Sequence, residues 1–109
     1  MPKPVKSYPV RLAGTRSYAM AVGWAMAGDA VQLLREPDNP FDADAIVAVD
    51  GAGRTLGYVP RDNWLRRALV DEGRGAAATV AESELGGLAL SVTLTGDGPI
   101  GARDFVPAD

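Results

Sequence analysis

The stretch that decides the fold runs through residues 35–46 and reads Arg35-Glu36-Pro37-Asp38-Asn39-Pro40-Phe41-Asp42-Ala43-Asp44-Ala45-Ile46. Apolar runs precede and follow it, and its two prolines cannot donate to a β ladder and bias the residue before them away from a helix. We therefore expect a stiff turn between two strands that displays Phe41 and Asp42. Such composition is typical of an ordinary turn, but loops on a rigid framework also carry binding residues. Composition alone leaves both interpretations open.

The segments on either side of this turn predict β structure. Residues 30–35 lead into it as a strand, and residues 45–49, apolar at every position, leave it as a strand covered on both faces. Residues 50–53 (Asp-Gly-Ala-Gly) predict a hairpin turn, and residues 54–59 predict the partner strand. Gly57 within that partner indicates a bulge or a close approach of another backbone.

The remaining segments add three strands and a short helix. Residues 8–13 and 88–95 alternate apolar and polar side chains, as half-buried strands do. Residues 75–82 are assigned to a third strand, although their alanines also favour a helix. Residues 15–27 predict a short helix with Ser17 as its cap.

A firmer helix is predicted after Pro60. Asp62 is its expected N-cap, and Gly73 is the expected residue that ends it. An apolar stripe at helical spacing comprises Trp64, Leu65, Ala68 and Leu69. Trp64 is therefore expected in the core, and Arg66 is expected to form a solvated (i, i+4) pair with Asp62.

These elements predict a mainly β (α+β) protein with about six strands and one or two helices. A sheet of this size removes its exposed edges by curling into a barrel-like shape under helical cover. The length of 109 residues suits one domain. We expect a loose arm at residues 1–7, the domain at 8–98 with residues 85–87 as a turn, and an irregular tail at 99–109.

Composition argues against several classes of function. The chain lacks cysteine and histidine, so it lacks thiol nucleophiles, thiolate metal sites and the usual general base. Asp38, Asp42 and Asp44 are close in sequence, but Ile46 and Val47 interrupt the pattern of a calcium loop. We therefore expect no enzyme, no cofactor and no metal site; a carboxylate-metal nuclease is the weakest alternative.

The sequence also bears on location. No apolar run reaches the roughly 18 residues that a membrane span needs, and no signal-peptide core follows the basic N-terminus. We therefore expect no membrane partner and a cytoplasmic location.

What remains is a set of candidate binding residues. It comprises Arg16, Tyr18, Phe41, Asp42, Tyr58 and Arg61. Aromatic rings stack on nucleobases with about 1–3 kcal/mol per base, and arginine forks bind phosphate. A carboxylate repels phosphate, so Asp42 suits such a site only if it accepts a hydrogen bond from a ligand donor such as a hydroxyl. Taken singly, each residue also has an ordinary explanation as a core-edge aromatic or a surface charge.

Three motifs in order resemble the HIRAN domain. They are residues 13–18 (Ala-Gly-Thr-Arg-Ser-Tyr), residues 34–46, which contain the central turn, and residues 53–61 (Gly-Arg-Thr-Leu-Gly-Tyr-Val-Pro-Arg). The resemblance covers about residues 8–95. This domain is found at the N-terminus of helicase-like transcription factor and related Swi/Snf-type translocases, and as free-standing bacterial proteins. The resemblance implies a six-stranded barrel-like sheet, similar to an OB-fold, with two helices.

The resemblance also implies a ligand. Eukaryotic HIRAN domains capture the 3′ end of single-stranded DNA, with bases stacked on aromatics and the terminal hydroxyl on a carboxylate of the central loop. Asp42 matches that carboxylate, and Phe41 matches the stacking ring without its hydroxyl. Arg16 matches an arginine that contacts phosphate or the end. Ser17 replaces the first of a tyrosine pair, and Tyr58 stands where DNA-binding members carry histidine.

The resulting hypothesis is a non-enzymatic module that binds the 3′-hydroxyl end of single-stranded DNA in DNA repair or replication-fork processing. Phe41 and Tyr58 would stack, Tyr18 would join the same binding set, and Arg16 and Arg61 would hold phosphates. Repair or helicase proteins are the expected partners. The alternative is a protein-interaction or small-ligand module that kept the fold and lost DNA binding. The net charge of −3 favours the alternative, and the retained binding residues favour the first.

Overall fold

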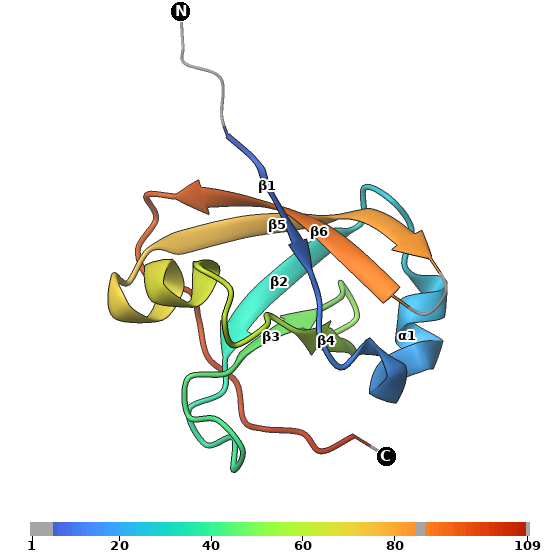
Figure 1. Ribbon diagram of the computed structural model, residues 1–109, viewed down its shortest axis with the longest axis horizontal. Helices are drawn as coiled ribbons and strands as arrows, with labels where there is room; N and C mark the ends of the chain where they lie inside the picture. The colour runs from blue at the N-terminus through green and yellow to red at the C-terminus, as the bar shows by residue number, and fades with distance from the viewer. Residues whose placement is uncertain (1–5, 85–86, 109) are drawn as a thin grey trace, which may run out of the picture.

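The protein is described by a computed structural model that covers residues 6–84 and 87–108 (Figure 1). Its strands are β1 (Tyr8–Arg11), β2 (Ala30–Arg35), β3 (Ile46–Val49), β4 (Thr55–Tyr58), β5 (Gly75–Glu84) and β6 (Gly87–Thr95). Its helical elements are the 3₁₀ helix η1 (Thr15–Tyr18), the α-helix α1 (Ala19–Trp24) and the π-helical turn η2 (Arg67–Asp71). The strand predictions are confirmed to within a few residues at their ends.

The six strands form one antiparallel sheet in the order β1-β6-β5-β2-β3-β4. The sheet curls so far that its two outer strands approach each other. Ala13, just after β1, and Tyr58 of β4 exchange two backbone hydrogen bonds of 2.8 and 2.9 Å. The predicted fold class, a barrel-like six-stranded sheet with short helices, is confirmed.

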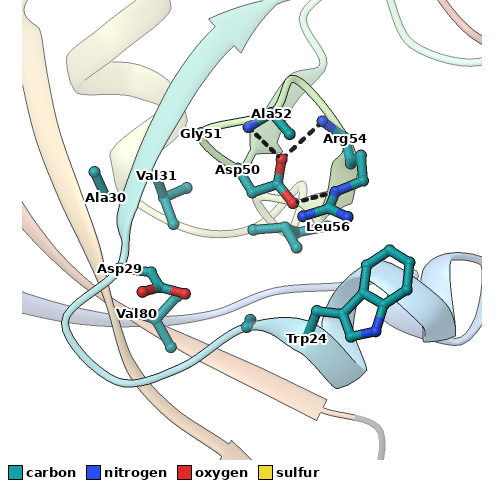
Figure 2. A pocket seen from close by; sticks show the side chains of 11 residues that line it. Trp24, Asp29, Ala30, Val31, Asp50, Gly51, Ala52, Arg54, Leu56 and Val80 are labelled. Atoms are coloured by element: carbon teal, nitrogen blue, oxygen red, sulfur yellow. Dashed lines mark hydrogen bonds and ion pairs between the residues drawn. The ribbon is translucent and has the colours of Figure 1, made fainter.

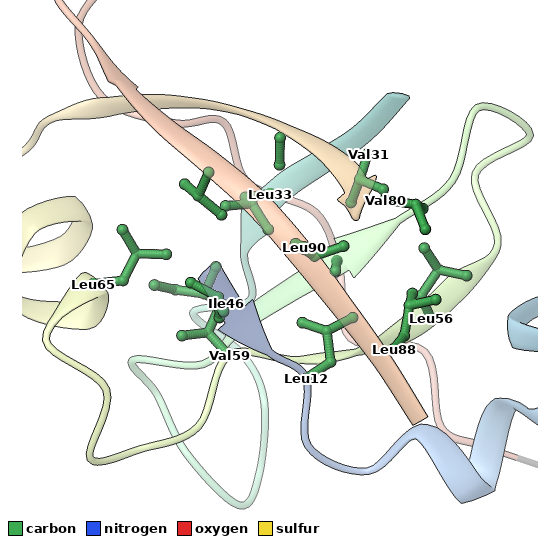
Figure 3. Packing of buried hydrophobic residues seen from close by; sticks show 14 of the residues in the cluster. Leu12, Val31, Leu33, Ile46, Leu56, Val59, Leu65, Val80, Leu88 and Leu90 are labelled. Atoms are coloured by element: carbon green, nitrogen blue, oxygen red, sulfur yellow. The ribbon is translucent and has the colours of Figure 1, made fainter. Parts of the chain in front are cut away.

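The core lies inside this curl (Figure 3). Ile46, Leu56, Leu88 and Leu90 are completely buried there. All four residues of β3 are buried, as its uninterrupted apolar sequence predicted. Because β3 has a hydrogen-bonded neighbour on each side, the loop that precedes it leaves from the middle of the sheet rather than from a free edge.

Gly57 permits the curl to close. A Cβ atom at this position would lie 2.8 Å from the carbonyl oxygen of Ala13 and 3.1 Å from Cγ2 of Thr15. Any larger residue would push β4 away from the segment that follows β1. The predicted close approach of another backbone at Gly57 is confirmed.

The helix after Pro60 differs from its prediction. Helical residues begin only at Leu65, and Asn63 rather than Asp62 accepts the Leu65 backbone N–H on its side chain, at 2.9 Å. Trp64 therefore precedes the helix, stays 46% exposed and meets Tyr8 edge-on with 4.9 Å between ring centroids. The expectation of a core Trp64 was wrong. Gly73 ends the helix as predicted, with a φ of 64°.

The early helix also starts differently. The chain enters η1 through Gly14, whose φ of 73° is left-handed, and no side chain caps the helix. The backbone N–H of Ser17 donates to the Gly14 carbonyl at 3.2 Å, so Ser17 lies inside the 3₁₀ turn instead of before it. The predicted Ser17 cap was wrong because the glycine, not the serine, makes the turn into the helix.

Residues after β6 return to the sheet. Ala102 forms a parallel bridge with Arg35 at the end of β2, and the flanking backbone hydrogen bonds to Gly101 and Arg103 are both 2.8 Å. Of the turn predicted at residues 85–87, residues 85 and 86 lie outside the described part of the chain. Within the described residues, no helix is long and apolar enough to cross a membrane.

Candidate functional site

The loop between β2 and β3 is shaped by Asn39. Its side-chain oxygen accepts the backbone N–H groups of Phe41 and Asp42 at 2.9 and 3.2 Å, and its amide nitrogen donates to Glu36 at 3.1 Å. This arrangement turns the Phe41 ring outward, where it is 76% exposed. The predicted display of Phe41 on a structured turn is confirmed.

Glu36 anchors the base of this loop. Its side chain is completely buried and accepts hydrogen bonds from the Tyr58 hydroxyl at 2.7 Å, from Asn39, and from Nε of Arg103 at 2.7 Å. Arg103 also donates to Oγ1 of Thr55 at 2.8 Å. A buried carboxylate is costly unless it is paired and hydrogen-bonded, and Glu36 satisfies both conditions.

Glu36 in turn alters Tyr58. Burial raises the pKa of the Tyr58 hydroxyl above its usual value, and the hydrogen bond to the Glu36 carboxylate and its charge raise this pKa further. Tyr58 therefore stays protonated at neutral pH and remains a donor to Glu36. Its ring faces that of Tyr18, with centroids 6.4 Å apart and planes at 47°.

Asp42 lies between two arginines. Its Oδ1 accepts from Nη2 of Arg66 at 2.9 Å and from the backbone N–H of Asp44 at 3.0 Å. Its Oδ2 has only a longer contact, 3.5 Å to Nε of Arg61. Arg61 also donates to the backbone carbonyl of Phe41 at 2.8 Å, so it connects the Phe41 backbone to the Asp42 carboxylate. Oδ2 is the oxygen that retains acceptor capacity for a ligand.

Arg66 is the site residue that the sequence did not reveal. It was expected to pair with Asp62, but its ion pair in the described structure is with Asp42. The two residues are 24 positions apart, and no local pattern connects them. They meet because the helix after Pro60 begins beside the central loop.

The structure thus places the predicted residues in two groups. Phe41, Asp42 and Arg61 contact one another, and Tyr18 packs on Tyr58. Asn39 and Glu36 connect the groups through hydrogen bonds. Arg16 is exposed on η1, two residues before Tyr18, and its side chain forms no hydrogen bond or ion pair with another described residue.

The C-terminal residues also reach this site. The Phe105 ring meets Phe41 edge-on at 6.2 Å between centroids, and the Phe105 backbone N–H donates to Oδ1 of Asp38 at 3.0 Å. These residues were expected to be an irregular tail, and nothing in their sequence indicated a contact with the central loop. Among the described residues, no cluster of three or more metal-ligating side chains occurs.

The model of the HIRAN domain family matches residues 5–95. The chain belongs to the HIRAN family. That match confirms the resemblance found in the three sequence motifs and takes in both groups of candidate residues. Arg103 and Phe105 lie beyond it.

Two solved structures share the fold. The HIRAN domain of human HLTF is 22% identical, with a TM-score of 0.66 over 81% of this chain and 74% of that one. A protein from Lactobacillus plantarum is 24% identical, with a TM-score of 0.69 over 84% of this chain and 95% of that one. At these identities the likeness demonstrates the fold of this HIRAN protein.

A curated protein is similar over a limited region. The mycothiol acetyltransferase of Actinosynnema mirum is 38% identical over an alignment of 90 residues, and the match covers 74% of this chain and 28% of that protein. This HIRAN chain therefore spans only 28% of the length of that relative.

Proposed function

We propose that this HIRAN protein binds single-stranded DNA at its 3′-hydroxyl end and catalyses no reaction. The observation that carries the proposal is the state of Asp42, which is oriented by Arg66 while its Oδ2 keeps acceptor capacity beside the exposed Phe41. A terminal hydroxyl would donate to Oδ2, and the terminal base would stack on Phe41. The outer face of the loop thus offers both contacts within neighbouring residues.

Charge supports a nucleic acid ligand at this position. Arg61 and Arg66 bring two positive charges to Asp42, although Asp38 and Asp44 lie on the same loop and the chain as a whole carries −3. The Arg61 side chain is 70% exposed and is free to turn toward a phosphate. Two arginines at one place suit one or two phosphates rather than a long duplex.

The biological setting follows from the ligand. Free 3′-hydroxyl ends on single strands arise during DNA repair and at replication forks, and we assign the protein to these processes. Repair or helicase proteins are the corresponding partners. In this proposal Tyr18, Tyr58 and Arg16 contact the nucleotides next to the end.

The test is a fluorescence-anisotropy titration with a short single strand that ends in either a 3′-hydroxyl or a 3′-phosphate. We expect tighter binding to the hydroxyl end, loss of this preference in Asp42→Ala, and weaker binding to both ends in Phe41→Ala. Asp44→Ala is the matched control, because Asp44 is a neighbouring exposed carboxylate that touches the cluster only through its backbone.

The other outcomes have distinct meanings. Preference for the phosphate end would contradict the role of Asp42 and assign the site to Arg61 and Arg66. Affinity that falls steeply with added salt would support phosphate contacts, with a slope of about −0.7 per phosphate neutralised. Absence of binding by a folded sample would leave the alternative, a protein-interaction or small-ligand module.

A further inference from the structure

A second surface feature adjoins the site. A groove of about 480 Å³ lies between η1 and α1 on one side and the C-terminal residues on the other. Its lining includes Tyr18, Met20, Trp24, Arg54, Arg103 and Val106. Among the described residues, this lining includes two arginines, and the carboxylates that pair with them, Asp50 and Glu36, do not line the groove. The groove therefore favours an anionic ligand with apolar parts.

Trp24 lines this groove together with Tyr18, and it also lines the neighbouring pocket drawn in Figure 2, beside Arg54, Asp29 and Asp50. Arg54 covers one face of its ring, with the guanidinium carbon 4.5 Å from the ring centroid. Trp24 nevertheless keeps 57% of its surface exposed, so much of its side chain is accessible to a ligand. Arg54 is oriented by Asp50, which accepts from its Nε at 2.8 Å and leaves the two Nη groups available.

The groove is continuous with the candidate 3′-end site. Tyr18 lines the groove and also packs on Tyr58. Arg103 lines it and also binds Glu36, at the base of the central loop. Phe105, two residues further on, contacts Phe41. The C-terminal segment therefore runs from the proposed end-binding loop to the mouth of the groove.

We propose that this groove binds the nucleotides that precede the terminal one, with a base stacked on Trp24 and phosphates near Arg54 and Arg103. Rings that stack with any base, beside arginines, are the features with which proteins bind single strands without sequence preference. The inference rests on the proposed function, because it assumes that the end of the strand is held at Asp42. It extends the site from one nucleotide to several.

The first test measures length dependence. Oligothymidines of two and of eight nucleotides, each with a 3′-hydroxyl, are titrated against the parent and Trp24→Ala. We expect the parent to bind the longer strand more tightly, and Trp24→Ala to weaken this binding about 5- to 150-fold while it binds the dinucleotide as the parent does. Trp64→Ala is the matched control, since Trp64 is also half-exposed but does not line the groove.

The second test reports on Trp24 directly. Trp64→Phe leaves Trp24 as the only tryptophan, because the chain contains two. We expect its fluorescence to be quenched by the eight-nucleotide strand and unchanged by the dinucleotide. Circular dichroism of each variant confirms that the protein is folded.

The outcomes separate the two proposals. If Trp24→Ala binds both lengths like the parent and keeps the hydroxyl preference, the groove proposal is overturned and the end site stands. If the longer strand binds through Trp24 without any preference for the hydroxyl, the end site is overturned and the groove stands. If folded parent protein binds neither strand, both are overturned.

Discussion

Glu36 is the residue on which the geometry of the site depends. Its neighbours in sequence, Arg35 and Pro37, give it the character of a surface turn residue, yet its side chain is completely buried. Removal of an ionised carboxylate from water is tolerated here because Tyr58, Asn39 and Arg103 all donate to it. Asn39 also accepts the backbone N–H groups of Phe41 and Asp42. The position of the binding loop therefore depends on the hydrogen bonds to the buried Glu36 carboxylate.

At this scale we predict that Tyr58 titrates above the usual value of a tyrosine. Its pKa is raised from 10.0 by burial and then by Glu36, so the resulting stabilisation is fully present below about pH 10 and is lost as the pH rises through the folded-state value. Tyr58→Phe should cost about 1–3 kcal/mol at neutral pH, because Glu36 loses a donor.

The measurement is a tyrosinate absorbance titration of the parent and of Tyr58→Phe. The ionisation that disappears in Tyr58→Phe should lie above the usual tyrosine value. The gap in unfolding free energy between the two proteins should be constant below pH 10 and should narrow above it. If the ionisation that is lost in Tyr58→Phe lies at the ordinary tyrosine value, the prediction is wrong.

At the scale of elements, closure of the sheet depends on β4. The pair Ala13–Tyr58 joins the two outer strands, and Tyr58 then lies between the sheet seam and the central loop. Gly57 precedes Tyr58, and the Ala13 carbonyl oxygen occupies the space that a side chain at Gly57 would need. The hairpin that starts β4 is held by Asp50, which accepts the backbone N–H groups of Ala52 and Arg54 at 2.9 Å each.

We predict that Gly57→Ala destabilises the protein by about 1–3 kcal/mol, the usual cost of forcing a methyl group into a filled space. The added Cβ would meet the Ala13 carbonyl oxygen at 2.8 Å and separate the outer strands. Gly51→Ala is the control, since a Cβ there has no neighbour within 4 Å. Urea denaturation provides the comparison, and equal midpoints for the two variants would show that the seam has room to adjust.

At the scale of the whole molecule, segments distant in sequence assemble the site. The central loop contacts β4, the helix after Pro60 and the C-terminal residues. The 3₁₀ helix η1 contacts β4 through Tyr18 and Tyr58. The C-terminal residues contribute Arg103, which joins the end of β2 to β4 through Glu36 and Thr55. These contacts hold the end of β2 and the start of β4 together.

We predict that Arg103→Met destabilises the protein by about 3–5 kcal/mol, because it leaves the Glu36 charge buried without its cation. The double variant Glu36→Gln/Arg103→Met should recover part of this loss, since no buried charge remains. Arg74→Met is the control, because the Arg74–Glu72 pair has a 4.0 Å separation with both side chains 51% exposed, and such pairs contribute about 1 kcal/mol or less. Unfolding curves that coincide for Arg103→Met and Arg74→Met would refute the importance of the buried pair.

Five features could be predicted from the sequence alone. They are the strands, the hairpin, the turn that carries Phe41 and Asp42, the helix end at Gly73, and the close approach of another backbone at Gly57. Each depends on local periodicity or on the backbone freedom of one residue, and both are visible in a short window of sequence. Four other features follow from the tertiary structure alone. Arg66 pairs with Asp42, Glu36 is buried, and Trp64 is half-exposed. Arg103 bonds both Glu36 and Thr55. These features depend on how far the sheet curls and on which segments then meet across it. Contacts between residues 24 or 67 positions apart leave no periodic signal in the chain.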